Sequence, residues 1–360
     1  MVAEDVDGFR VTQIDSSDVA SEEPPSVADR DGVVGDSQRR SRSGFLLSRV
    51  GPWAVPIFLV LLFIGFSIAT PTFGTVDNAR IIITNQAVVV LLGMAIIVPL
   101  RAGDFDLSVS SVMIVSGATI GVLHSNGHSG LTAIAVAVLI GPVVGLFNGI
   151  LVVKIGIDSF IATLGTLTII TGFVSLMTKG ALITTFPEGL TNFAEHRILD
   201  FPMPVWVGWA IALALWYVFE KTPAGRYLLF IGGNRGSAQL AGLRVDGYRQ
   251  GAFLLSGTLS AIAGVMFAGG LGSVDPSSGT SYLLPPITAA FLGASAITIG
   301  RFNVVGTLFA IYMLAVGITG LQLLGLDRWI ANVFNGVCLL LAMAFAILLK
   351  NASAKWSAQR

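Results

Sequence analysis

The sequence predicts an all-α, polytopic membrane protein with about ten transmembrane helices, and three observations lead there. Hydrophobic residues make up 54% of the 360 residues and charged residues only 12%, about half the charged share of ordinary soluble domains. The apolar residues are gathered in runs near the ~20 residues that a bilayer-crossing helix needs. Glycine is abundant, with 42 residues, which suits the close packing of helices in lipid.

The amino-terminal region differs from the rest of the chain. Residues 1–36 hold ten acidic and two basic residues, whereas residues 37–360 hold 19 basic and 11 acidic ones. We predict that residues 1–44 form a disordered acidic cytoplasmic tail, because they are polar, rich in Ser and Pro, and poor in aromatic residues. They lack the early basic-then-apolar pattern of a signal peptide.

Ten apolar segments follow, and together they define a transmembrane domain over residues 45–350. Because a backbone in hydrocarbon must satisfy its own hydrogen bonds, these segments should be helices. Their predicted ranges are 52–70, 81–100, 106–123, 131–153, 159–178, 203–219, 250–270, 285–299, 303–324 and 329–349. The segment 285–299 is short enough for a partial span. Residues 351–360 should form a cytoplasmic carboxyl-terminal tail.

The distribution of Lys and Arg predicts the orientation. A basic cluster, Arg39, Arg40, Arg42 and Arg49, precedes the first segment and should hold that end in the cytoplasm. With ten spans both termini are then cytoplasmic, in the inner or plasma membrane, and 15 of the 19 basic residues after position 36 fall on the inner side. The polar interval 220–250 also lies inside.

Small residues recur at four-residue spacing in two of the segments. Gly117 and Gly121 lie in one segment, and Gly141, Gly145 and Gly149 lie in the next. This spacing lets helices approach closely, so we expect packing contacts here rather than hinges.

The interval 220–250 is the longest charged stretch between two apolar segments. Gly232, Gly233 and Asn234 favour a tight turn, SAQLA favours one or two helical turns, and Gly242 can end them. Ala238 and Ala241 would give this short helix a face of small side chains, and such a face suits a cleft on a partner protein.

Two carboxylates, Asp104 and Asp106, lie next to the third segment. Asp106, or Ser108 after it, can cap the helix that follows, and Arg101 could pair with either acid. The alternative is a proton or ion site, which would make the protein a secondary transporter. Asp158 and Asn303 precede other apolar segments and are further predicted caps.

Several polar residues lie inside the apolar segments, and two interpretations stay open for them. They can form hydrogen bonds between helices, or some of them can line a hydrophilic path for a polyhydroxylated solute. They are Asn85, Gln86, Asn148, Thr163, Thr166, Thr168, Thr171, Asn332 and Asn335.

The sequence offers no catalytic set. It has no GxxxxGK[ST] phosphate loop, so we do not expect it to bind ATP, and no Gly-x-Ser-x-Gly elbow. His124, His128 and His196 have no Cys or carboxylate at metal-ligand spacing, so no metal is predicted. Cys338 lies in an apolar segment and is predicted to be an inert thiol.

Three blocks resemble one family of transport proteins. They are TPAGRYLLFIGGNRGSAQLAGLRVDGYRQGAFLLSG, RAGDFDLSVSSVMIVSG and GLFNGILVVKIGIDSFIATLGTLTIITGF. In order and spacing they are similar to blocks of ABC-transporter permeases. The branch is that of the ribose, xylose, arabinose and galactose importers, which work with a binding protein. The resemblance covers most of residues 80–345.

The resemblance implies a fold, partners and roles. Such permeases lie in the bilayer, pair with a second permease copy, bind a cytoplasmic ATPase that holds the ATP, and receive solute from an extracytoplasmic binding protein. Nucleic acid is not a partner. The family's ATPase-coupling loop falls on Gly232, Gly233, Asn234, Ala238 and Gly242. Its DLS block falls on Asp106, Leu107 and Ser108.

The sequence departs from the family pattern at a few positions. Ser237 and Leu243 replace the usual Ala and Ile, and Arg101 stands where small or polar residues are usual. GASAITIGRFNVVGT replaces a Gly-rich turn with Arg301, Phe302 and Asn303, which leaves solute identity or helix packing open there.

The expected function is therefore import of a monosaccharide or related polyol. A branched-chain amino acid or nucleoside permease of the same superfamily and an ion-coupled secondary transporter remain alternatives, and an enzyme is disfavoured.

Overall fold

The computed structural model describes residues 51–357, and the side chains of residues 51–344. The predicted acidic tail 1–44 and the basic cluster Arg39, Arg40, Arg42 and Arg49 lie outside the described residues.

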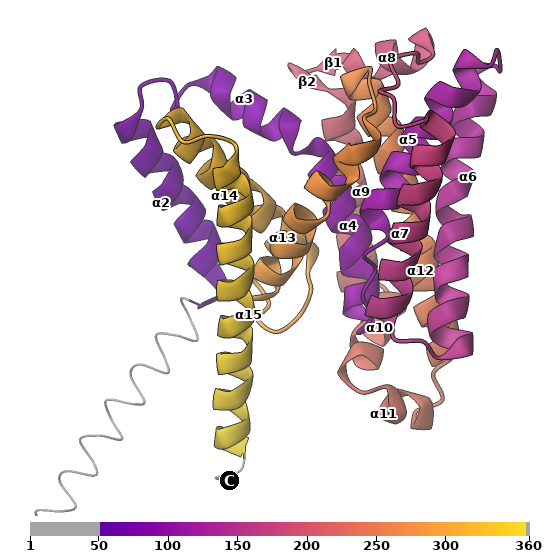
Figure 1. Cartoon of the computed structure of the whole chain (residues 1–360). Coiled ribbons are helices and arrows are strands. Elements are labelled where there is room, and N and C mark those ends of the chain that lie inside the picture. Colours follow the sequence, from indigo (N-terminus) through magenta and orange to yellow (C-terminus); the bar gives the residue numbers. More distant parts are fainter. Residues whose placement is uncertain (1–50, 358–360) are drawn as a thin grey trace, which may run out of the picture. The chain divides into compact units, whose positions relative to one another are not determined.

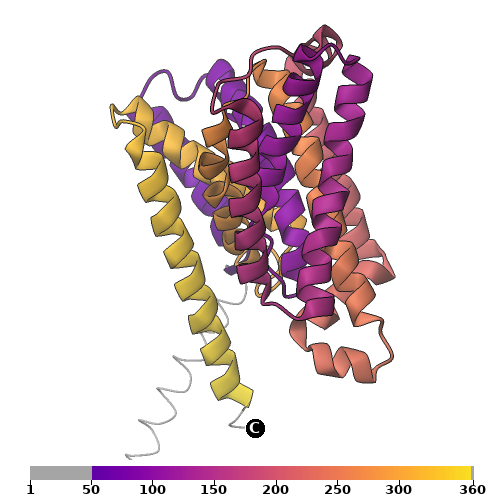
Figure 2. The same cartoon turned by 45° about the vertical axis from the view of Figure 1, so that its right-hand side comes forward.

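The described chain is almost wholly helical, as predicted, and Figures 1 and 2 show its helices from two sides. In chain order the helical elements are η1 (Gly51–Trp53), α2 (Ala54–Ala69), α3 (Val76–Asn85), α4 (Ala87–Arg101), α5 (Val109–Ser125), α6 (Gly130–Gly149), η2 (Ile150–Ile155), α7 (Ser159–Thr178), α8 (Glu188–Glu195), α9 (Met203–Lys221), α10 (Pro223–Gly233), α11 (Arg235–Leu240), α12 (Val245–Leu271), η3 (Pro276–Tyr282), α13 (Leu284–Ala294), α14 (Val304–Leu323) and α15 (Trp329–Ser357).

Each of the ten predicted segments is mainly helical, but 81–100 is divided between α3 and α4 and 285–299 is helical only to Ala294. The count of ten membrane spans is not confirmed. Among the described residues, six helices are long and apolar enough to cross a bilayer, or seven if the bent pair α3–α4 is one span. Helix α5 and the apolar part of α15 are shorter, and α13 has only 11 residues. Helix α15 continues to Ser357, through most of the predicted carboxyl-terminal tail.

Helices α4 and α12 form the centre of this arrangement. Nearly every residue of α4 is buried, and α12 packs along α4, α5 and α6. By contrast, α2 and α7 expose large apolar side chains such as Ile68 and Leu176, which are 82% and 75% exposed. These outer faces suit contact with lipid, whereas the polar groups described below lie among the inner helices.

The predicted glycine packing is confirmed between α6 and α12. A Cβ atom at Gly141 would overlap the backbone of Gly257, and one at Gly145 would overlap the backbone of Phe253. A Cβ at Gly117 would lie 3.1 Å from the carbonyl oxygen of Gly264 on α12. The absence of side chains at these positions therefore sets how closely α5 and α6 approach α12.

A small antiparallel strand pair was not predicted. Strands β1 (Arg197–Ile198) and β2 (Phe201–Pro202) are joined by Leu199 and Asp200, both with positive φ. The Asp200 carboxylate accepts a hydrogen bond of 2.7 Å from Arg80 in the middle of α3. Two-residue strands carry no periodicity that a sequence pattern can reveal.

The α6–α12 contact gives a first testable prediction. Gly257→Ala places a methyl group against the backbone of Gly141, so we expect the free energy of unfolding in detergent to fall by about 1–3 kcal/mol, as overpacking does.

Gly165→Ala on α7 is the matched control, because nothing lies within 4 Å of its added Cβ. That variant should be neutral or slightly stabilising, since Ala favours helix over Gly. Equal thermal stabilities of the two variants would refute the close contact.

Candidate functional site

The segment between α9 and α12 forms the predicted short helix. Asn234 precedes α11, and its side-chain oxygen accepts a 2.9 Å hydrogen bond from the amide of Ser237. Gly242 ends the motif with φ +79°, a conformation that favours glycine. Gly232 and Gly233 lie in the last turn of α10, so the predicted three-residue turn is wrong and only Asn234 makes the break.

The two glycines have different surroundings. A Cβ atom at Gly232 would overlap the carbonyl oxygen of Arg101, whereas nothing lies within 4 Å of a Cβ at Gly233. Gly232 thus holds α10 against the carboxyl end of α4, and Gly233 leaves open space on the surface.

The face expected for Ala238 is also corrected. Ala238 is fully buried and packs with Ile231 and Val245, because the inner side of α11 has to cover the start of α12. The exposed apolar residue of the short helix is Leu240, with 93% of its surface accessible. Sequence reasoning missed this residue, although it is the only large apolar side chain in RGSAQL.

Asp104 anchors the short helix to the helical core. Its carboxylate accepts hydrogen bonds from Arg249 Nε (2.7 Å) and Nη2 (2.8 Å) on α12. Arg235 at the start of α11 donates to the same carboxylate and to the carbonyl oxygen of Gly103, both at 2.8 Å. The Asp104 side chain is 2% exposed. One buried charge therefore joins the α4–α5 connection, α11 and α12.

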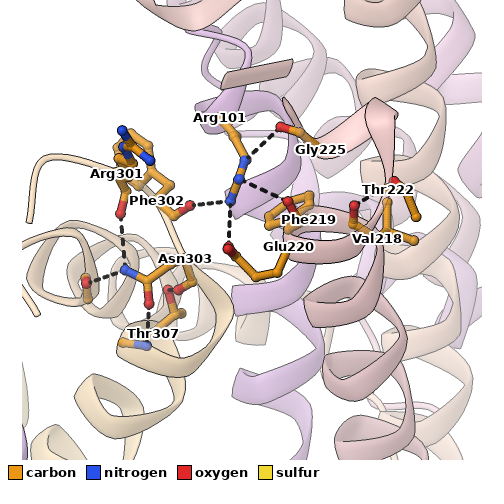
Figure 3. A network of polar contacts seen from close by, with 12 residues as sticks. Arg101, Val218, Phe219, Glu220, Thr222, Gly225, Arg301, Phe302, Asn303 and Thr307 are labelled. Carbon is orange, nitrogen blue, oxygen red and sulfur yellow. Dashed lines mark hydrogen bonds and ion pairs between the residues drawn. The ribbon is translucent and has the colours of Figure 1, made fainter. Parts of the chain in front are cut away.

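Arg101 makes a second anchor, which Figure 3 shows from close by. Its guanidinium donates to the carbonyl oxygens of Gly225 (3.2 Å), Phe219 (3.2 Å) and Phe302 (3.1 Å) and lies 3.6 Å from a carboxylate oxygen of Glu220. The predicted pairing of Arg101 with Asp104 or Asp106 is wrong.

The reason for this partner choice lies in the proline that begins α10. The carbonyl of Phe219 would normally accept from the amide four residues later, which is Pro223 and has no N–H. That leaves a free acceptor where α9 meets α10, and Arg101 fills it. The contact with Phe302 also brings together the two places, Arg101 and the 301–303 turn, where the sequence departs from the family pattern.

Asp106 lies in a closed hydrogen-bond network. Its two carboxylate oxygens accept from the Ser108 amide (3.0 Å) and hydroxyl (2.6 Å) and from the Ser256 hydroxyl (2.7 Å). Ser108 in turn accepts from Asn148, and Asn148 accepts from Thr166. Asp106 is fully buried, so the network ties α5, α6, α7 and α12 together.

The predicted helix caps have mixed outcomes. Asp158 accepts from the amides of Phe160 and Ile161, and Asn303 accepts from that of Gly306, so both caps are confirmed. Ser108 has the N-cap position of α5 but makes no capping bond with its side chain. The backbone amide of Ser108 instead donates a hydrogen bond to the Asp106 carboxylate.

Leu107, Cys338 and the candidate metal ligands remain from the sequence predictions. The backbone amide of Leu107, itself a core residue, donates to the Thr163 hydroxyl. Cys338 is a half-buried free thiol. Among the described residues, no three His, Cys, Asp or Glu side chains lie together as a metal site would need.

The Asp104 anchor leads to a second prediction. Asp104→Ala leaves the Arg249 guanidinium buried without its anion, so we expect a loss of about 3–5 kcal/mol in the free energy of unfolding. The measurement is thermal unfolding of the purified chain in detergent.

Asp246→Ala is the control, because this acid lies on the same helix but is exposed. Its removal should cost under about 1 kcal/mol. An unfolding temperature for Asp104→Ala as high as that of Asp246→Ala would contradict the anchoring role.

Comparison with known proteins places these features in context. Residues 78–343 match the sequence model of the family described as "branched-chain amino acid transport system / permease component". The ribose import permease of Haemophilus influenzae is 33% identical over 291 residues, which is 80% of this chain and 90% of that protein. The ribose import permease of Bacillus subtilis is 31% identical over 85% of this chain and 95% of that protein. An L-arabinose ABC transporter permease of Azospirillum brasilense is 29% identical over 88% and 92%. No solved structure matches the chain significantly.

Proposed function

The chain belongs to the transport-system permease family that its residues 78–343 match, and from this premise we propose that it is the membrane-spanning subunit of an ABC importer for a monosaccharide or related polyol. The observation that carries the proposal is the similarity to ribose and arabinose permeases along at least four-fifths of the chain. The chain is a transport component, and ATP is bound and hydrolysed by a separate cytoplasmic subunit.

The proposed partners follow from this role. An ATPase docks on the α10–α11 segment, an extracytoplasmic binding protein delivers the solute, and a second permease copy completes the path through the inner or plasma membrane. Both termini lie in the cytoplasm. The excess of Lys and Arg in the segments assigned to that side supports this orientation.

The docking surface consists of Gly233, Asn234 and Leu240. Gly233 leaves room for a partner, and Leu240 offers the apolar contact. The other three residues of the predicted loop set the shape of the segment. Gly232 packs on α4, Ala238 packs on the start of α12, and Gly242 ends the short helix.

Movement of the ATPase reaches the transmembrane helices through the Asp104 anchor. A displacement of α11 pulls Arg235, whose partner Asp104 also holds Arg249 on α12. Because α12 packs on α4, α5 and α6, a shift of α11 is passed to the centre of the helix assembly. The DLS block, Asp106, Leu107 and Ser108, keeps the start of α5 fixed to α12 through Ser256.

The ion-coupled transporter is not favoured. Asp104 has two arginine partners, and Asp106 accepts hydrogen bonds from two serines within a sealed network. A carboxylate that binds and releases a coupling ion during transport needs a path to solvent. Both acids are 2% exposed or less.

The docking surface gives a third prediction. Gly233→Trp adds a large side chain at an exposed position where nothing lies within 4 Å of the new Cβ, so the assembled importer should lose at least tenfold in ATP-driven uptake while the purified permease keeps its unfolding temperature. Gly233→Ala is the control and should transport normally, since its methyl group meets nothing within 4 Å. Normal uptake by Gly233→Trp would remove Gly233 from the docking surface.

The orientation gives a fourth prediction. A cysteine at Ser237, which is exposed on α11, should react with a membrane-impermeant thiol reagent only after the cells are permeabilised. A cysteine at Asn126, in the exposed α5–α6 turn, should react in intact cells. The reverse pattern would overturn the proposed topology.

A further inference from the structure

A polar cavity of about 440 Å³ lies beside the bend between α3 and α4. The carboxyl end of η3, the start of α13, the second half of α14 and the start of α15 form its other walls. Both views show α3 and the turn between α14 and α15 at the opposite end of the helices from α10 and α11 (Figures 1 and 2). In the proposed orientation this is the end that faces the binding protein.

Five amide side chains converge on this cavity, which we call the amide pocket. Asn85 and Gln86 come from the α3–α4 bend, Gln322 from α14, and Asn332 and Asn335 from α15. An amide offers donors and an acceptor together, which matches the hydroxyl groups of a sugar. Four of these five residues belong to the polar set for which sequence analysis left a hydrophilic path open.

One amide oxygen has no hydrogen-bond partner among the described residues. Asn335 is 5% exposed, and its Nδ2 donates to the carbonyl of Ala331 at 2.8 Å. Its Oδ1 is buried and has no hydrogen-bond partner among the described residues. An unsatisfied buried acceptor costs free energy, and a hydroxyl group of a bound solute would supply the missing donor.

The other walls of the pocket are mostly apolar. Ile311, Leu314 and Ile318 of α14 and the ring of Tyr282 add apolar surface, which suits the C–H face of a pyranose or furanose ring. Among the described residues, Arg328 is the only charged residue in the lining, and no acidic side chain is part of it. The pocket therefore lacks the counter-charge that the ammonium group of an amino acid requires, which favours a neutral polyol.

The bend beside the pocket supports the assignment. Helices α3 and α4 would form one span but meet at an angle of 43°, with Gln86 between them. Interrupted membrane helices are a recognised pointer to substrate sites in transporters, and here the interruption places Asn85 and Gln86 on the wall of the cavity.

A second cavity of about 460 Å³ lies on the other side of η3, between α5 and α7. It is lined by hydroxyl groups, including those of Thr171 and Ser175, and by Asp275. The backbone amide of Ser277, followed by its hydroxyl, lowers the pKa of Asp275 by hydrogen bonding, so this cavity carries a negative charge. None of the described residues that line it has a buried amide without a hydrogen-bond partner, so this cavity serves as the comparison site.

We propose that the amide pocket receives the solute from the outer side and that the solute is a neutral, polyhydroxylated molecule of monosaccharide size. This inference rests on the proposed import function and names the residues of the chain that recognise the solute: Asn85, Gln86, Gln322, Asn332 and Asn335.

The test uses the complete importer, with its ATPase and binding protein, in proteoliposomes. Uptake of D-ribose, L-arabinose and L-leucine by the unaltered complex first identifies the solute class. Asn335→Leu and Asn332→Ala should then raise the KM for the imported sugar at least tenfold. Thr171→Val and Ser175→Ala, in the comparison cavity, should leave the KM within twofold. Asn332 is exposed, so its variant keeps the test valid if Asn335→Leu fails to fold.

The outcomes separate the two proposals. If the unaltered complex imports a sugar and both amide-pocket variants keep a normal KM, the assignment of the pocket is wrong and the import function stands. If only the Thr171 and Ser175 variants change the KM, the solute binds in the comparison cavity and the pocket is again refuted. If the unaltered complex hydrolyses ATP but imports only L-leucine, the proposed function fails, and the inference fails with it.

Discussion

The carboxylate of Asp104 is the constraint on which the arrangement of this protein depends. It is buried and shared between Arg249 of the long central helix and Arg235 of the short surface helix. A buried charge without a partner is costly, so the three elements that meet there must keep their positions together or move together. The same interaction thus fixes the fold locally and offers a rigid connection between surface and core.

An arginine and a glycine act together to satisfy a backbone carbonyl group near the junction of α9 and α10. Arg101 satisfies a carbonyl that Pro223 leaves free, and Gly232 lets α10 come close enough for that to happen. In a medium without water each polar backbone group needs an internal partner. Polar side chains near the ends of α4 and α9 therefore complete hydrogen bonds that a soluble protein would leave to solvent.

The polar residues inside the apolar segments fall into two groups with different physical roles. Asn148 and Thr166 belong to the hydrogen-bond network around Asp106, and Thr163 accepts from the Leu107 amide, so all three hold helices together. Asn85, Gln86, Asn332 and Asn335 border open space instead, and Asn335 keeps an unused acceptor. Satisfied groups stabilise the structure, whereas unsatisfied groups around a cavity are available to a ligand.

The sequence alone determined the helical membrane fold, the positions of the apolar segments, the caps Asp158 and Asn303 and the short helix before Gly242, because these follow from composition and local backbone chemistry. Only the tertiary structure decided that Arg101 turns away from Asp104, that Ala238 faces inward while Leu240 faces outward, and which amides border a cavity. These outcomes depend on contacts between residues more than 100 positions apart, such as Asp104 with Arg249, or on which face of a short helix is covered. No local pattern shows which face of a short helix such as RGSAQL the rest of the fold covers.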